Sequence, residues 1–479
     1  MKIALVKPPA TYANWYRQPA LGIAYICACH RAEGYNCEIF DGYFHSWSPD
    51  ELIEHVTKYN PDIIGITAMT HEIQQAAAIA SQLKERTAVP LVIGGCHVTA
   101  LPERTLSEFP VFDYGIYGEG EETFIELVKH IEGATSPGIR NIHGLVFREN
   151  LNVVVNEARP FCTEEKLNSL PYPAIDHYYA DNKEALAHPN LYYVMFTSRG
   201  CPYKCAFCMQ VLGRKVRRRS IESIIGEMKY AIDSYGAHIF NFADEIFLFD
   251  NLHTRKLLEL FVENDFPRRI KWSALTRANF VTPELIALAK KAGCVRLEMG
   301  VESGDNQILR GIDKAITVEQ VKKAVKIIKD AGISLGTYYI LGHPDENRTT
   351  LRKTVDLAVK LNTDSIAVGL MVPYPGTRIF DLAMQGKNGY RLLSQNWSEY
   401  DKYGGKVLEI DGLPYAELVK WQQQTYLRLY IVNRRFKDCF EFFWKRRKGI
   451  SFVLKKKLLS LHRIGNRNYN ENINNNRLS

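Results

Sequence analysis

The sequence has no run of apolar residues long enough to cross a bilayer, although hydrophobic residues make up 46% of its 479 positions. The amino-terminal stretch MKIALVKPPATYANW has too short an apolar run for a signal peptide and lacks a small-residue cleavage site. It is typical of a first β-strand instead. We therefore expect a cytoplasmic globular protein, and its length predicts about three domains.

Disulfide bonds are not expected, because most of the ten cysteines of a cytoplasmic chain stay reduced. Seven of them are scattered and are predicted to be small buried side chains: Cys27, Cys29, Cys37, Cys96, Cys162, Cys294 and Cys439. The other three, Cys201, Cys205 and Cys208, lie in the stretch RGCPYKCAFC with the spacing C-x3-C-x2-C.

This cluster has no second cysteine pair after it, which a structural zinc site with four ligands would need. Three close thiolates suit a [4Fe–4S] cluster with one iron left free. A catalytic zinc held by three cysteines remains an alternative. Clustered cysteines in a reduced chain therefore indicate a metal centre with an open position.

The first part of the chain alternates short apolar strands with amphipathic helices. This alternation predicts a Rossmann-like, doubly wound parallel sheet over residues 1–136, whose ligands would bind at the carboxyl ends of the strands. Residues 137–190 are less regular. We interpret them as a linker that contains a β-hairpin around Glu149 and Asn150.

A second series of strands and helices runs from residue 191 to 390, with six strand–helix units. Six units in about 200 residues predict a partial (β/α)6 barrel. The clustered cysteines directly follow its first strand, LYYVMFTS, on the side where such barrels build their active sites. Residues 391–479 are expected to form a helical, basic region that ends in a disordered asparagine-rich stretch.

The cysteine spacing, the aromatic residue before the last cysteine and the preceding strand together resemble the radical S-adenosylmethionine (SAM) superfamily. The resemblance implies that Cys201, Cys205 and Cys208 bind a [4Fe–4S] cluster whose free iron binds SAM. It places Phe207 near the adenine, Asp244 and Glu245 (NFADEIF) at the methionine amino group, and Arg277 (TRAN) at its carboxylate. In LEMGVESG it places Glu298, Glu302 and Ser303 near the ribose or the methionine. For each charged residue taken alone, a solvated loop end or a structural ion pair is an equal alternative.

The first domain resembles the cobalamin-binding domain of one branch of this superfamily, through the ordered set PP, LGIAY, GIT-x-MT, IGGCHVTALPE and YGEGEETF. The resemblance covers residues 1 to about 390. It suggests that cobalamin lies near Thr67, Thr70, Gly94, Gly95, His97, Gly118 and Glu119. Turns shaped by glycine alone are the alternative. The histidine motif D-x-H-x-x-G is missing, since Asp41 and His45 have another spacing, so no histidine ligand to cobalt is expected.

The resemblance implies an enzyme that generates a 5′-deoxyadenosyl radical and methylates an unactivated carbon. Radical cyclisation, oxidation or rearrangement without methyl transfer is one alternative, and a non-catalytic corrinoid or metal-binding carrier or sensor is another. The implied partners are a small-molecule substrate and an electron donor such as flavodoxin or ferredoxin; a nucleic-acid partner is not expected.

The carboxyl-terminal region carries a strong positive charge. The stretch from Arg434 to Arg463 contains eleven basic residues (Lys and Arg) and only two acidic ones, Asp438 and Glu441, and aromatic residues lie between them in the sequence. Peripheral membrane contact with a lipid-like substrate, and a capping helix with a solvated basic face, are the two interpretations.

Overall fold

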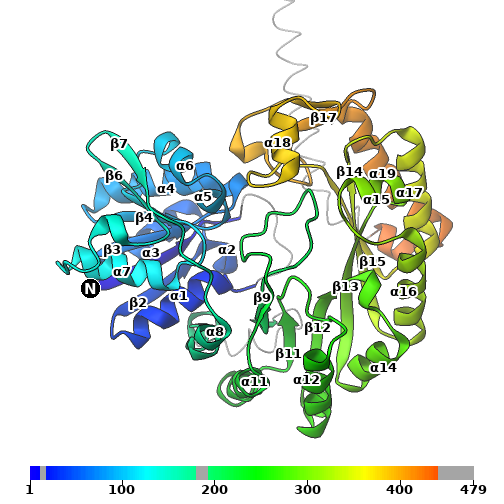
Figure 1. The fold of residues 1–479 in the computed structure, drawn as a ribbon, viewed down its shortest axis with the longest axis horizontal. Coiled ribbons are helices and arrows are strands. Elements are labelled where there is room, and N and C mark those ends of the chain that lie inside the picture. The colour runs from blue at the N-terminus through cyan, green and yellow to red at the C-terminus, as the bar shows by residue number, and fades with distance from the viewer. Residues whose placement is uncertain (11–17, 180–191, 441–479) are drawn as a thin grey trace, which may run out of the picture.

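A computed structural model describes residues 1–10, 18–179 and 192–440 of the chain. Two lobes lie side by side, the first built on a mainly parallel sheet and the second on a parallel sheet, and the carboxyl-terminal segment with α18 and β17 lies above them in the view of Figure 1. Among the described residues, no helix has the length and apolar character that a membrane span requires.

The first lobe is a seven-stranded sheet of order β2-β1-β3-β4-β5-β6-β7 with helices on both faces. Its strands are β1 (Lys2–Lys7), β2 (Asn36–Asp41), β3 (Ile63–Thr67), β4 (Leu91–Gly94), β5 (Tyr114–Ile116), β6 (Leu145–Glu149) and β7 (Asn152–Val155). Its helices are α1 (Leu21–Ala32), α2 (Gly42–His45), α3 (Pro49–Tyr59), α4 (Ile73–Arg86), α5 (Cys96–Ala100), α6 (Pro102–Glu108) and α7 (Glu121–Ile131), with the 3-10 turns η1 (Thr70–Glu72) and η2 (Ile139–Asn141).

The predicted hairpin around Glu149 and Asn150 exists, but it belongs to this sheet. Strand β6 pairs antiparallel with β5, and β7 pairs with β6. The hairpin therefore forms the edge of the first lobe, although the sequence had placed it in the linker. The remainder of the connection carries α8 (Glu164–Ser169) and α9 (Asp176–Tyr179).

The second lobe is a six-stranded parallel sheet of order β15-β14-β13-β12-β11-β8, curved as a partial barrel. Its strands are β8 (Tyr193–Met195), β11 (Ile239–Phe242), β12 (Lys271–Thr276), β13 (Cys294–Glu302), β14 (Ser334–Leu341) and β15 (Ser365–Leu370). The helices and turns around it are α11 (Ile221–Tyr235), α12 (Leu252–Glu263), α13 (Phe266–Arg269), η3 (Ala278–Phe280), α14 (Pro283–Lys291), α15 (Asn306–Gly311), α16 (Val318–Asp330) and α17 (Arg348–Leu361). The α/β fold predicted from the sequence is confirmed.

The last strand of the barrel has an edge that a side-chain clamp covers. Helix α19 (Tyr415–Val432) places Tyr426 so that its hydroxyl accepts from the Val368 amide at 2.9 Å, while Gln422 donates to the Val368 carbonyl at 2.8 Å. Satisfying these edge groups prevents strand pairing with another chain. The segment before α19 comprises α18 (Arg378–Met384), β16 (Tyr390–Leu392), η4 (Trp397–Glu399) and β17 (Leu408–Ile410).

One apolar core runs through both lobes. At their junction the ring of Phe44 packs edge-on against Tyr178, with centroids 4.7 Å apart, and Tyr178 donates a hydrogen bond to Asp41 at 3.0 Å. A shared core makes the two lobes one packing unit, so the space between them has a defined shape.

Candidate active site

The three clustered cysteines lie on a loop that a two-stranded ribbon holds at both ends. Strand β9 (Ser198–Arg199) pairs antiparallel with β10 (Arg217–Arg218), and the loop between them carries the cysteines. The Cys201 amide donates to the Gly213 carbonyl at 3.1 Å, and the Cys208 amide donates to Cys205 at 3.0 Å. The predicted place after the first barrel strand agrees with this loop.

All three thiols are free. Among the described residues, no three His, Cys, Asp or Glu side chains converge as the ligands of a single metal ion do. In an iron–sulfur cube, by contrast, the three cysteines bind separate irons at separate corners. Burial raises the pKa of the Cys201 thiol, and the charges of Glu245 and Cys205 raise it further. A cationic iron centre would relieve this crowding of negative charge, so the donor set fits such a cluster.

Two charged side chains beside the cysteines have polar atoms without a protein partner. Glu245, at the carboxyl end of β11, has a buried Oε2 atom with no hydrogen bond, and burial raises its pKa above the usual range. Arg277, at the end of β12, is 5% exposed and leaves Nε and Nη2 unpaired. Its guanidinium carbon lies 3.6 Å from the ring centroid of Tyr203, and its Nη1 lies 3.9 Å from Cys205 Sγ.

Buried polar atoms without partners are costly, so they indicate a missing ligand. An anion and a cation beside one thiol cluster match the amino and carboxylate groups of an amino acid such as the methionine part of SAM. The residues present therefore fit the predicted cofactor. Which of its atoms each residue binds remains a prediction.

Asp244 differs from its neighbour. It was predicted at the methionine amino group, but it is fully buried and its carboxylate is already bonded. It accepts from the Thr197 amide and from the hydroxyls of Thr197 and Ser198, the last at 2.5 Å. Asp244 therefore fixes the strand that leads into the cysteine loop and leaves Glu245 as the open carboxylate.

The last residue of β13 is the predicted Glu302. Its backbone is left-handed, with φ +67°, and its Oε1 lies 2.7 Å from the buried Nζ of Lys314. Lys314 in turn lies 5.7 Å from the ring centroid of Phe207, whose other neighbour is the buried His343 at 6.1 Å. The buried ion pair of Glu302 and Lys314 therefore lies next to Phe207 in the cysteine loop, and Lys314 is the member of the pair that lies over the Phe207 ring.

The other two residues of that motif are also engaged. Ser303 is fully buried; its hydroxyl contacts Thr354 at 3.2 Å and accepts from the Asp305 amide. Glu298 lies deeper in the strand and accepts from Arg296 at 2.6 Å. The hydrogen bonds of both residues are structural, which agrees with the alternative interpretation, and their place near the ribose or the methionine stays a prediction.

A large cleft joins this site to the first lobe. It has a cavity volume of about 660 Å³ and is lined from the first lobe by Thr67, Gly94, Gly95, Gly118 and Glu119, which were predicted at cobalamin. Its barrel side carries Phe196, Arg199, Met209, Val211, Leu212, Ala243 and Glu245. Most of the remaining lining is apolar, from residues such as Leu5, Ile23 and Phe124. A flat, bulky cofactor fits such a cleft by shape.

Gly95 shows why glycine is needed at the floor of this cleft. Its φ is +100°, and a Cβ atom there would lie 2.7 Å from the Ala68 carbonyl oxygen and 2.8 Å from Thr67 Oγ1. No other residue adopts this conformation readily. This part of the cleft lining therefore requires glycine at position 95.

Thr70 and His97, also predicted at cobalamin, do not line the cleft. Thr70 is 4% exposed, in the turn η1. His97 is 1% exposed and packs edge-on against Trp397, with centroids 5.0 Å apart. Burial lowers its pKa to about 4. Trp397 comes from far along the chain, which is why this docking role was not visible in the local motif.

Glu119 lines the cleft, but its carboxylate is held by the barrel. It accepts from Arg199 at 3.0 Å and from Arg217 at 2.9 Å, and Glu121 accepts from the other nitrogen of Arg199 at 2.6 Å. Burial alone would raise the pKa of Glu119, but the arginines hold it below its usual range. We name Glu119, Glu121, Arg199 and Arg217 the inter-lobe ion cluster.

Sequence reasoning missed several lining residues, among them Cys96, Met209, Val211 and Leu212. It also missed Tyr203 beneath Arg277, although an aromatic residue two positions after the first cysteine was a usable signal. Asp41 and His45, whose spacing departs from the D-x-H-x-x-G motif, have structural contacts. Asp41 caps α2 by accepting from the Phe44 amide at 2.8 Å, and His45 stacks on Trp47.

Two family models match this chain. The B12 binding domain model matches residues 16–128, and the radical SAM superfamily model matches residues 195–358. The first covers the lobe that forms the apolar wall of the cleft, and the second covers the cysteine loop and most of the barrel. The predicted cofactors, a [4Fe–4S] cluster, SAM and cobalamin, are confirmed at this level.

Relatives align along nearly the whole chain. A protein named as an uncharacterized methyltransferase from Pyrococcus horikoshii is 31% identical over 475 residues, which are 97% of this chain and 98% of the relative. An anaerobic magnesium-protoporphyrin IX monomethyl ester cyclase from Rubrivivax gelatinosus is 26% identical over 94% of this chain and 82% of its own. The structure of the radical SAM methyltransferase TsrM from Kitasatospora setae, with cobalamin and a [4Fe–4S] cluster bound, has a TM-score of 0.71 at 18% identity and covers 89% of this chain and 91% of its own, which shows a shared fold. The chain therefore belongs to the radical S-adenosylmethionine enzymes that carry a cobalamin-binding domain.

Proposed function

We propose that this enzyme transfers a methyl group to an unactivated carbon of a small molecule. One observation supports the proposal most directly: Glu245 and residues of the cysteine loop line the same cleft as the first lobe. Met209, Val211 and Leu212, directly after the last cysteine, face Gly94 and Gly95 across one continuous space. A substrate in this space is within reach of both cofactor sites.

When bound, the cluster with SAM would supply the radical chemistry, and cobalamin would supply the methyl group. The chain's own residues bind and orient. Cys201, Cys205 and Cys208 would hold three irons of the cluster, Glu245 would accept hydrogen bonds from the ammonium group of SAM, and Arg277 would donate to its carboxylate. The stacking of Arg277 on Tyr203 fixes the direction of the guanidinium fork. The apolar cleft wall excludes water, which protects a reactive carbon centre from side reactions.

The names of two similar proteins support methyl transfer. The relative from Pyrococcus horikoshii is named a methyltransferase, and TsrM is described as one. A second candidate is radical cyclisation without methyl transfer, which the similar ester cyclase from Rubrivivax gelatinosus favours. A non-catalytic corrinoid carrier would leave the unpaired atoms of Glu245 and Arg277 without a purpose.

The decisive experiment uses the full chain, reconstituted anaerobically with iron, sulfide and cobalamin. The enzyme, a chemical reductant and SAM with a deuterated methyl group are incubated with a metabolite extract, and products are followed by mass spectrometry. We expect 5′-deoxyadenosine and S-adenosylhomocysteine together with a metabolite that carries the labelled methyl group. 5′-Deoxyadenosine alone, with an unlabelled product, would favour cyclisation, and output equal to that of Cys205→Ala would exclude radical catalysis.

Peripheral membrane contact is the finer part of the partner proposal. Most of the basic stretch from Arg434 to Arg463 lies outside the described residues. The part that is described ends in exposed apolar side chains: Ile431, Val432, Phe436 and Phe440 are 59–65% exposed. Basic and aromatic residues together favour an anionic membrane interface and a lipid-like substrate. Co-sedimentation with anionic vesicles should fall when the chain is cut after residue 430; equal pelleting would exclude the contact.

A further inference from the structure

Two of the scattered cysteines meet inside the first lobe, and neither lines the cofactor cleft. Cys27 lies on α1 and Cys37 on β2, which are neighbours at the lower edge of the lobe in Figure 1. Both are buried, as predicted, and the Cys37 thiol forms a hydrogen bond with the Cys27 sulfur. Cys27 Sγ also lies 3.2 Å from the Cys37 carbonyl oxygen. These are the contacts of polar groups, which the prediction of small buried side chains did not include.

A histidine and a carboxylate complete the surroundings of Cys27. His177, on α9, forms a hydrogen bond with the Cys27 side chain. Its Nε2 atom lies 2.9 Å from Glu38 Oε2. A thiol beside an imidazole that a carboxylate orients is the arrangement that activates a cysteine as a nucleophile. The first lobe thus contains an activated thiol that the proposed methyl transfer does not use.

Arg31 adds a permanent positive charge to this group. Its Nε donates to the Cys37 carbonyl at 2.9 Å, its Nη1 donates to Asp176 at 2.9 Å, and its Nη2 contacts His177. A cation close to a thiol favours the thiolate, which is the reactive form. Arg31 therefore stabilises a negative charge on Cys27 and also holds α9 against the first lobe.

Cys27 differs in pKa from an ordinary buried cysteine of this chain. The hydrogen bond from Cys37 lowers the pKa of Cys27 to about 6, with a smaller contribution from His177, although burial opposes both. Burial would lower the pKa of His177, but its hydrogen bonds to Cys27 and Glu38 raise it to about 9. At Cys294, by contrast, burial raises the pKa of the thiol. At neutral pH the first pair is therefore a thiolate beside an imidazolium, whereas Cys294 is a neutral thiol.

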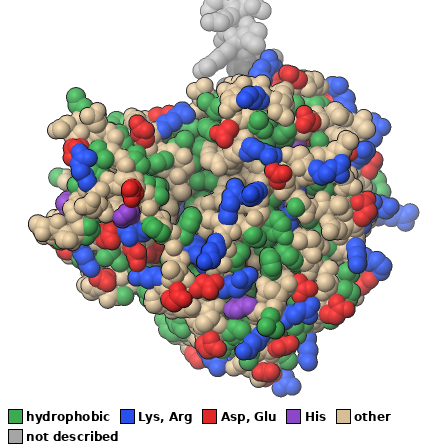
Figure 2. Space-filling model, in the orientation of Figure 1, with side chains coloured by type: hydrophobic (Ala, Val, Ile, Leu, Met, Phe, Trp, Pro, Cys, Tyr) green, Lys and Arg blue, Asp and Glu red, His purple; other side chains and the backbone are tan. Residues whose placement is uncertain are grey.

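A single layer of side chains covers the two thiols. The side chains of Arg31, Glu38 and His177 are 31%, 34% and 20% exposed. Figure 2 shows acidic and basic side chains mixed over the visible face of the first lobe, at the left, and this cover has the same mixed character. Because α9 has only four residues, its local opening costs little free energy. A molecule little larger than water then reaches Cys27.

We propose that Cys27 and Cys37 are a redox-active pair that hydrogen peroxide oxidises to a disulfide. His177 first takes the proton of the Cys27 thiol. The thiolate attacks one peroxide oxygen, the O–O bond breaks, and the leaving hydroxide takes that proton from His177 to form water. The Cys37 sulfur then attacks the sulfenic sulfur of Cys27, the S–O bond breaks, and hydroxide leaves with the Cys37 proton as a second water.

The reaction balances without a further reagent. The two thiols lose two electrons and two protons, and one peroxide molecule becomes two waters. A small dithiol reverses it by thiol–disulfide exchange. The inference does not depend on the proposed methyl transfer.

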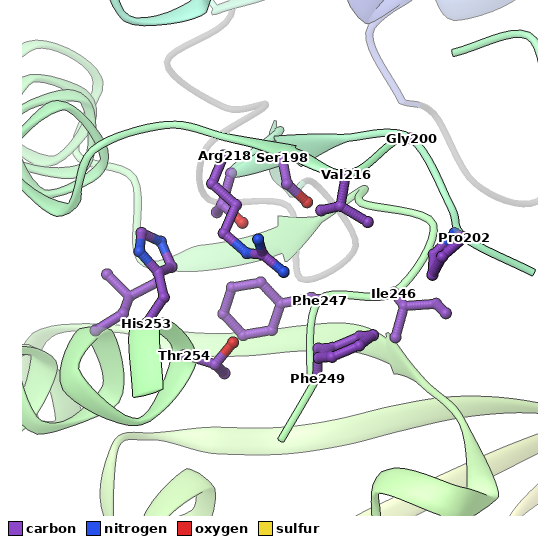
Figure 3. Close-up of a pocket in the computed structure, with 12 residues that line it drawn as sticks. Ser198, Gly200, Pro202, Val216, Arg218, Ile246, Phe247, Phe249, His253 and Thr254 are labelled. Carbon is purple, nitrogen blue, oxygen red and sulfur yellow. The ribbon is translucent and has the colours of Figure 1, made fainter. Parts of the chain in front are cut away.

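The test has to distinguish this pair from the cysteine loop, which peroxide can also enter. Figure 3 shows a hollow with Arg218 and His253 on one side and Pro202 on the other. Its cavity volume is about 20 Å³, enough for one water-sized molecule, and its lining includes Gly200, directly before Cys201. The full, reconstituted protein is therefore treated with stepwise equivalents of hydrogen peroxide, alkylated and digested. Mass spectrometry then assigns each cross-link to its two cysteines.

We expect a cross-link between Cys27 and Cys37 at peroxide amounts about tenfold lower than those that oxidise Cys294, and we expect dithiothreitol to reverse it. Cys29→Ser, on the same helix, is the matched control and should keep the cross-link. Cys37→Ser should replace it by a sulfenic acid on Cys27 that dimedone traps. Oxidation of Cys294 before Cys27, or a first cross-link from Cys27 to any other cysteine, would overturn the proposal.

His177→Gln tests the positioning role of the histidine. The rate at which iodoacetamide alkylates Cys27 should reach half its maximum at about pH 6 in the unmodified protein. In the variant this midpoint should move up by about one pH unit or more, because the thiolate loses its imidazolium partner. A lower rate with an unmoved midpoint would mean that His177 is only structural and would overturn the activated pair.

Discussion

The two lobes are both α/β units whose parallel strands present their carboxyl ends to one cleft, yet they offer different chemistry there. The barrel end carries free thiols and unpaired polar atoms on Glu245 and Arg277. The first lobe presents close backbone at Gly94 and Gly95 together with apolar side chains, and its carboxylates Glu119 and Glu121 are bound by barrel arginines.

This difference teaches how each lobe recognises its cofactor. In the proposed function the barrel recognises charge, because an ammonium and a carboxylate group need partners of opposite sign in a buried place. The first lobe would recognise shape, because a bulky, flat ring system needs room and apolar contact. Substitutions should therefore divide into those that remove a charge partner at the barrel and those that fill space in the first lobe.

The largest effect is expected from Cys205→Ala. Loss of one of three thiolates should abolish the iron–sulfur absorbance and reduce bound iron and sulfide to background, because two cysteines cannot hold the cube. Binding of cobalamin to the first lobe should be unchanged. Loss of both cofactors together would show that the two lobes do not bind independently.

Next comes Glu245→Gln at the barrel. Removing the open carboxylate should weaken SAM binding by roughly 10- to 100-fold, the usual loss for a charge-assisted hydrogen bond of about 1.5–3 kcal/mol. Equilibrium dialysis with labelled SAM measures it. The matched control is Asp244→Asn at the preceding position. This variant should lower the free energy of unfolding, while the fraction that stays folded should bind SAM with nearly unchanged affinity. A larger effect of Asp244 on SAM affinity would reverse the assignment.

Gly95→Ala tests the shape of the first lobe. The new methyl group would collide with the Ala68 carbonyl, and the backbone would be strained by about 1–3 kcal/mol. We expect cobalamin retention to fall while SAM binding stays near normal. Gly34→Ala is the control, since Gly34 also has a positive φ, +88°, but has open space and lies outside the cleft. Equal cobalamin loss in both variants would mean that strain alone is responsible.

The smallest effect is expected on the pH dependence of stability, through the contact between His97 of the first lobe and Trp397. The folded pKa of His97 is about 4, below the ordinary value of 6.5, so the unfolded chain binds a proton that the folded chain refuses. Stability should therefore be lost as pH falls from 6.5 towards 4. At about pH 5.5 this amounts to about 1.4 kcal/mol. His97→Phe should remove that share of the pH dependence in urea unfolding curves; an unchanged slope would contradict the assignment.

Much of the architecture could be predicted from local pattern. The stretch RGCPYKCAFC, from Arg199 to Cys208, identified the loop, and the alternation of strands and helices identified both sheets. Helix ends were equally readable: Thr317 and Gln320 form the capping box of α16, and Gly236 ends α11 in a left-handed conformation. Such features depend on neighbours within a few residues, which the sequence states directly.

What could not be predicted depends on contacts between distant segments. Asp244 and Glu245 are adjacent, and only the strand's alternation decides which one is open. Ser303 is engaged by Thr354, and His97 by Trp397. Glu119 fitted a cofactor motif, but its partners Arg199 and Arg217 lie 80 or more positions away. A motif shows that a residue is special without showing which neighbour it serves.

The inter-lobe ion cluster has a consequence for how these lobes can be exchanged. Arg199 is two positions before Cys201, and its charge is neutralised entirely by carboxylates of the other lobe. A chimera that took its first lobe from a relative without both glutamates would bury unpaired guanidinium groups beside the cysteine loop, at a cost of several kcal/mol. The four side chains of the inter-lobe ion cluster therefore have to be kept together when lobes are exchanged to engineer new substrate ranges.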